Sequence, residues 1–149
     1  MSYLDEIIYI IKGNQIFIDY TIFKKYATSD KFNDIVNHTI QIIQRTLLIY
    51  PTFELHVNLC KFNISSLSKY KDIIQIFINN TLQCFSNSFT HLFIYHTPSI
   101  MTTIFNIISK YIHNNAYKHI KIKLYNKDDS ENHIYNLKYQ SPSEMTIDI

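Results

Sequence analysis

Glycine is almost absent from this 149-residue chain, in which Gly13 is the only one. The dinucleotide-binding fingerprint and the phosphate loop of P-loop NTPases each need several glycines at fixed spacing, because the backbone must turn tightly against the phosphates. The sequence therefore excludes nucleotide binding by either loop. It also lacks the small residues that flank the nucleophile of an α/β-hydrolase.

Metal-binding and catalytic patterns are missing as well. The seven histidines are scattered, and none forms a His-x-x-x-His pair or stands beside a Cys-x-x-Cys. The two cysteines, Cys60 and Cys84, lie in segments that we expect to be structured, and neither has the surroundings of a catalytic thiol. We therefore predict no metal, no cofactor and no enzymatic activity.

Charge and hydropathy are moderate. The chain has twelve acidic residues and a net charge of +2. A charge this small does not indicate a nucleic-acid partner. No apolar run approaches the roughly 18 residues needed to cross a bilayer, and no secretory signal is visible. We expect a cytoplasmic protein with free thiols.

The chain is rich in Ile, Asn and Lys, which AT-rich codons encode. This bias suits the AT-rich genome of a large DNA virus or a protist.

The apolar pattern predicts one α/β domain over residues 1–149, with 141–149 as a flexible tail. Two β-rich runs flank Gly13-Asn14, which is typical of a hairpin. After the hairpin, strands are expected to alternate with helices. The expected strands are 53–62, 91–97 and 117–126, and the expected helices begin at Ser29-Asp30, Ser65-Ser66 and Ser99. This order implies right-handed crossovers and a mostly parallel sheet with helices packed on it.

Beyond Asn126 the pattern weakens. We expect a polar loop over 127–132 and a last edge strand over 133–140.

The expected strands have two unlike faces. One face carries aliphatic side chains and should pack under helices, and it includes Leu55, Val57, Leu92 and Ile94. The other face mixes aromatic and charged residues, namely Glu54, His56, Asn58, Phe93, Tyr95, Lys121, Lys123 and Tyr125. The lysines around residue 120 could bind anionic headgroups or nucleic-acid phosphates, or could simply prevent pairing at a sheet edge.

The helix expected over 99–113 has an unusually broad apolar side. An apolar side of this width normally means that the helix contacts two separate partners, such as the sheet and a second helix or ligand, rather than one. The helix could be wedged between the sheet and another helix, or it could also touch a bound apolar molecule or a partner.

Two stretches resemble the CRAL-TRIO, or Sec14-like, domain family, and most closely its divergent BCH-type branch. They are "FELHVNLCKFNISSLSKYKDIIQIF" and "LFIYHTPSIMTTIFNIISKYIHNNAYKHIKIKL". The resemblance implies a CRAL-TRIO-like α/β sandwich in which the helix after the His-Thr-Pro turn is a gate over a lipid cavity. The gate residues it implies are Ile100, Met101, Ile104, Phe105 and Ile108.

The sequence departs from that family at several motif positions. Asn58 stands where the family has Asp, and Lys61 where it has Gly. Asn87 and His119 stand where the phosphatidylinositol-binding members have Glu and Lys, so phosphoinositide exchange is not implied. In those relatives the cavity floor is the mixed face of the sheet. Burying Glu54 and lysines beside an acyl chain would cost several kcal/mol unless they were paired, so a deep, dry tunnel is disfavoured there.

The sequence thus favours a binding module without catalysis. We expect a lipid or other apolar ligand, a protein partner such as a small GTPase or a second copy of the chain, and peripheral membrane contact. The expected headgroup or interface residues are Lys118, His119, Lys121, Lys123, Phe93, Tyr95 and His96. The alternative is a STAS-like regulatory domain that would signal through Ser65, Ser66 or Ser68, although these serines also suit helix capping.

Overall fold

The computed structural model describes residues 2–82, 84–111 and 120–139. Within these residues, five strands form one sheet: β1 (Ile8–Lys12), β2 (Gln15–Asp19), β3 (Phe53–Asn58), β4 (Phe89–Tyr95) and β5 (Lys121–Leu124). The helical elements are α1 (Tyr3–Ile7), α2 (Tyr20–Tyr26), η1 (Ser29–Lys31), α3 (Phe32–Leu47), α4 (Ile64–Lys69), α5 (Lys71–Phe77), the π-helical turn η2 (Ile78–Leu82), α6 (Met101–Tyr111) and α7 (Lys127–Tyr139).

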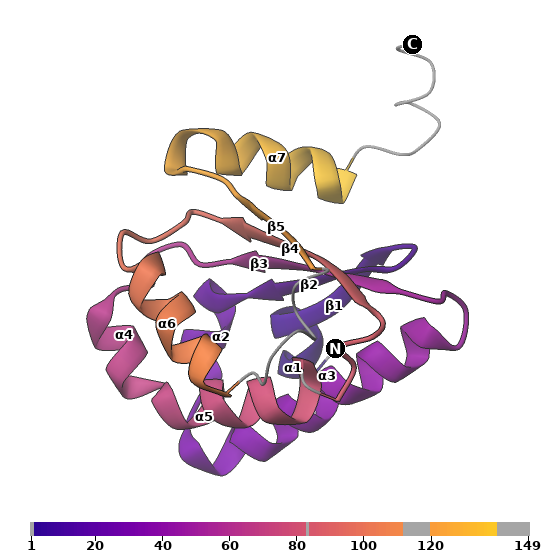
Figure 1. Ribbon diagram of the computed structural model, residues 1–149, viewed down its shortest axis with the longest axis horizontal. Helices are drawn as coiled ribbons and strands as arrows, with labels where there is room; N and C mark the ends of the chain where they lie inside the picture. The colour runs from indigo at the N-terminus through magenta and orange to yellow at the C-terminus, as the bar shows by residue number, and fades with distance from the viewer. Residues whose placement is uncertain (1, 83, 112–119, 140–149) are drawn as a thin grey trace.

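The strand order explains where the helices lie. The strands follow one another in chain order from β1 to β5, with β1 antiparallel to β2 and all later pairs parallel. Successive right-handed crossovers that always step in one direction place every connecting helix on the same face of the sheet. Figure 1 shows helices α1 to α6 on one side of the sheet and α7 on the other. The mixed α/β fold with a mostly parallel sheet is confirmed.

The hairpin is confirmed, but its flanks are helical. Gly13 has a φ of +56°, the left-handed conformation that a tight hairpin turn needs and that glycine adopts without strain. The β-rich run after the turn ends early because Asp19 caps a helix. Its Oδ1 accepts a hydrogen bond from the Thr21 backbone N–H at 3.0 Å, and α2 begins at Tyr20.

The prediction for residues 127–139 is wrong, because this segment is the helix α7 rather than a loop and an edge strand. Asn126 starts the helix by accepting a hydrogen bond from the Asp129 N–H at 2.9 Å, and Asp128 and Asp129 suit the positive end of the helix dipole. Only Ile134 and Leu137 carry its apolar contact with the sheet. So narrow a stripe gives little helical periodicity to detect.

The cap of the helix after β3 also differs from the prediction. Asn63, not Ser65 or Ser66, is the N-cap of α4, and Ser66 completes a capping box with it. Two residues earlier, Lys61 has a φ of +66°. This is the position where the CRAL-TRIO family has glycine. Glycine adopts this left-handed backbone conformation without strain, which explains the preference for glycine there.

The apolar core lies mainly between the sheet and helices α1 to α6. The predicted faces are confirmed, since Leu55 and Ile94 belong to this core, whereas Tyr95 belongs to a smaller cluster on the other face. That smaller cluster is centred on Phe17 and Ile134, where α7 crosses the sheet.

Candidate functional site

A cavity of about 200 Å³ lies between the aliphatic face of the sheet and the helices that cover it. Its floor comes from neighbouring strands at matching register, Leu55 and Val57 of β3 opposite Leu92 and Ile94 of β4. Side chains on one face of a sheet stand side by side at each register position. The alternation in the sequence therefore makes a continuous hydrocarbon floor.

The roof of the cavity is equally apolar. Helix α5 contributes Ile73 and Phe77, its N-cap residue is Tyr70, which also lines the cavity, and α2 contributes Tyr20 and Phe23. The Tyr20 hydroxyl donates a hydrogen bond to Ser66 Oγ at 2.7 Å, so its polar end already has a partner within the protein. A cavity lined in this way offers almost nothing to a water molecule, which needs two to four polar partners.

Two of the predicted gate residues reach this cavity. Met101 and Ile104 of α6 are buried and line it. Ile100 and Phe105 are half-buried and pack against the same core. The side chain of Ile108 lies outside the described residues. The broad apolar side of α6 thus packs against the protein core and also faces the cavity.

The cavity lies on the opposite side of the sheet from the mixed face, which the resemblance implied as its floor. On the mixed face a ligand would lie beside Glu54 and the lysines, so the sequence disfavoured a dry site there. The cavity instead opens on the aliphatic face, where no charge has to be buried. The roof residues were missed as a site, although the apolar stripe of the helix after β3, with Tyr70, Ile74 and Phe77, was visible in the sequence.

The mixed face carries a hydrogen-bonded network. His56 is buried, its Nδ1 lies 2.8 Å from the Tyr95 hydroxyl, and its Nε2 lies 3.2 Å from Glu54 Oε1. Phe93 stacks on the His56 ring with centroids 4.4 Å apart. Tyr95 is only 3% exposed, and burial together with the nearby Tyr125 and Glu54 raises its hydroxyl pKa. Its side chain is therefore unavailable for the surface role predicted from the sequence.

The pKa of the Glu54 carboxyl is held below its usual value of 4.5, chiefly by the hydrogen bond from His56 and further by the charges of His56 and His91. A carboxyl whose folded-state pKa is depressed stabilises the fold above its unfolded pKa, and this contribution is lost as the pH falls through the folded pKa. We expect the stability advantage of the native protein over Glu54→Gln to shrink below about pH 4.5. Urea denaturation at a series of pH values measures it, and an advantage that stays constant into acid would contradict this assignment.

The other predicted surface residues separate from one another. Lys121 and Lys123 are exposed on β5, a strand at the edge of the sheet. His96 lies beyond the end of β4, and its Nε2 is 2.7 Å from Glu131 Oε1 of α7. Phe93 is half-buried in the network described above. Lys118 and His119 lie outside the described residues.

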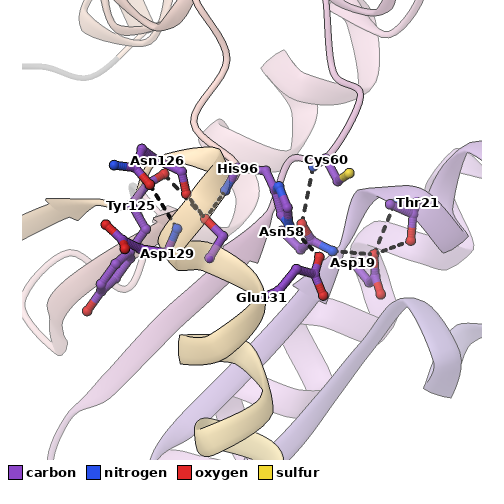
Figure 2. A network of polar contacts seen from close by, with 10 residues as sticks. Asp19, Thr21, Asn58, Cys60, His96, Tyr125, Asn126, Asp129 and Glu131 are labelled. Carbon is purple, nitrogen blue, oxygen red and sulfur yellow. Dashed lines mark hydrogen bonds and ion pairs between the residues drawn. The ribbon is translucent and has the colours of Figure 1, made fainter.

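A second group of polar contacts lies at the carboxyl ends of the strands (Figure 2). Asp19, the last residue of β2, accepts hydrogen bonds from Thr21 and from Asn58 Nδ2, the latter at 3.3 Å. Asn58 in turn accepts one from the Cys60 backbone N–H at 3.2 Å. These bonds fix the start of α2 and the end of β3, next to which Tyr20 and Leu59 line the cavity. The group therefore shapes one end of the cavity.

Metal and membrane signals are weak over the part of the chain that the structure describes. Within it, no three His, Cys, Asp or Glu side chains come together as metal ligands. None of its helices has both the length and the apolar content needed to pass through a bilayer.

Comparison with solved structures supports the fold. The chain is similar to the crystal structure of Sfh5, a Sec14-family protein, with a TM-score of 0.65 and 12% sequence identity. The likeness covers 83% of this chain and 49% of the other, so the protein spans about half the length of that neighbour. No protein-family description and no curated protein matches the sequence. The fold is therefore Sec14-like, or CRAL-TRIO-like, and the comparison does not single out the BCH-type branch.

Proposed function

We propose that this protein is a binding module that holds an apolar molecule, such as the alkyl chain of a lipid, in the cavity beneath its sheet. The observation that carries the proposal is the cavity of about 200 Å³ with its aliphatic and aromatic lining. Apolar cavities of roughly 150 Å³ stay dry and accept benzene-sized molecules. The Sec14-like fold of the neighbouring structure is in keeping with a lipid ligand.

The size of the cavity limits the ligand. Pockets that enclose whole drug-sized molecules measure about 300–1,000 Å³, so the described space suits one alkyl chain or a small hydrocarbon ring. A larger lipid would require a wall to move. Helix α6 is the wall we assign to this role, since Met101 and Ile104 line the cavity from a helix that follows the Thr97-Pro98 turn. The role requires binding alone and no chemical step.

A second candidate function is the binding of a protein at the β5 edge. The partner would be a small GTPase-like protein or a second copy of the chain. Ile122 and Leu124 of β5 are 49% and 46% exposed beside Lys121 and Lys123. An exposed edge strand is a template for pairing with another chain, although its lysines oppose such pairing.

Native mass spectrometry of the purified protein tests both candidates. If an apolar ligand is bound, we expect a mass above that of the polypeptide, and organic extraction should release an alkyl compound. A homodimer would appear directly at twice the mass. Protein that carries no ligand and shows no rise in melting temperature with octanol would contradict the proposed binding function.

A further inference from the structure

Four consecutive residues at the end of α3 form an exposed apolar tip, which we define as Leu48–Pro51. Leu48 is 85% exposed, Ile49 75% and Tyr50 38%, and Pro51 is also exposed. Single apolar residues on a surface are ordinary, but a run of three or four consecutive ones signals a function. Neither the cavity lining nor the apolar cluster on the mixed face includes this tip.

The tip is held outward by its backbone rather than hanging loosely. The N–H groups of Ile49 and Tyr50 both donate to the Thr46 carbonyl, at 3.1 and 2.9 Å. On the far side, Asn14 of the hairpin turn donates to Thr52 at 3.3 Å. The end of α3 and the hairpin turn lie together at the right of Figure 1. The two aliphatic side chains therefore project into solvent from a fixed scaffold.

The charges around the tip are of one sign. From Ile35 to Phe53 the chain contains no acidic residue, and its one permanently charged residue is Arg45, which is exposed one turn before Leu48. The adjoining hairpin, from Ile7 to Ile18, likewise has Lys12 as its only charged residue. Glu54, the nearest acidic residue after the tip, lies on the mixed face in its bonds with His56.

We propose that the tip Leu48–Pro51 inserts into an anionic lipid surface and docks the protein there. Aliphatic side chains that project beside cationic residues can bury themselves at the headgroup boundary while the cations attract anionic lipids. Tyrosine is enriched at that boundary because its ring is apolar and its hydroxyl stays hydrated. A stable protein partner would bury about 1,200–2,000 Å², far more than a four-residue projection supplies.

The docking surface is independent of the cavity. Neither Leu48 nor Ile49 lines the cavity. Val57 does line it, and it lies on β3, the middle strand of the sheet. Docking can therefore fail while ligand binding survives, and the reverse also holds.

Sedimentation with lipid vesicles tests the proposal. The full chain should pellet with vesicles of phosphatidylcholine and phosphatidylserine in equal parts, and much less with phosphatidylcholine alone. The double variant Leu48→Ser/Ile49→Ser should weaken this binding by on the order of a hundredfold. Arg45→Gln should weaken it by roughly fivefold, and only for the anionic vesicles. Both variants alter exposed side chains, so their melting temperatures should match that of the native protein.

The matched control is Ile122→Ser/Leu124→Ser, which removes two exposed aliphatic residues from β5 and should pellet like the native protein. Val57→Phe, which blocks the cavity, should also pellet normally. The proposal is overturned if the native chain does not bind the mixed vesicles, or if Leu48→Ser/Ile49→Ser binds them equally well. A native dimer that this variant converts to a monomer in size-exclusion chromatography would equally overturn it, since a second copy would then cover the tip.

Discussion

Replacing Val57 with phenylalanine is expected to abolish the binding of octanol, used as a probe for an alkyl chain. Val57 stands on β3 in the floor of the cavity, and strand side chains project nearly perpendicular to the sheet. The larger ring must therefore occupy the space in which a ligand would lie. A ligand present at 100 times its dissociation constant stabilises the native state by about 2.7 kcal/mol, and this stabilisation should fall to near zero in the variant.

Thermal melting with and without octanol measures the effect. Overpacking a core typically costs about 1–3 kcal/mol, well below the stability of an ordinary domain, so Val57→Phe should still fold. The matched control is Ile122→Phe, which puts the same ring on the same face of the sheet but at the exposed edge strand β5. An octanol response that survives in Val57→Phe, or one that disappears in the control, would place the ligand elsewhere.

Phe17→Ala is expected to produce the largest loss of stability. The Phe17 ring is fully buried on the mixed face, where it stacks with Tyr9 and Tyr95 and packs against Ile134 of α7. The Lys138 ammonium group lies 4.3 Å from the centre of the same ring. Truncating a buried phenylalanine leaves a void and typically lowers the free energy of unfolding by about 3–5 kcal/mol.

Chemical denaturation of Phe17→Ala and of Tyr135→Ala gives the comparison. Tyr135 is on α7 but 60% exposed, so its truncation should change the free energy of unfolding by less than about 0.5 kcal/mol. A loss near 1 kcal/mol for Phe17→Ala would mean that α7 does not cover the sheet. The experiment thus tests an element that the sequence failed to predict.

The resemblance to CRAL-TRIO domains predicted more than the apolar pattern could. Periodicity alone left open whether α6 was a plain core helix, whereas the resemblance implied five gate residues, of which Met101 and Ile104 line the cavity. It also misplaced the cavity, because it carried over the mixed face as the floor. The side of the sheet on which space remains depends on how the helices pack, and short motif matches do not contain that information.

Local chemistry was enough to predict most of the elements. Gly13 predicts the hairpin because a tight turn requires positive φ, and the alternation around Leu55 and Val57 predicts a strand with an aliphatic face, because side chains in a strand alternate between the two sides. These properties depend on neighbours along the chain. Tertiary structure alone decided that α7 crosses the mixed face, that His56 and Tyr95 meet on that face, and that a cavity remains on the other side. Each of these depends on contacts between residues distant in sequence, whose energies no local pattern records.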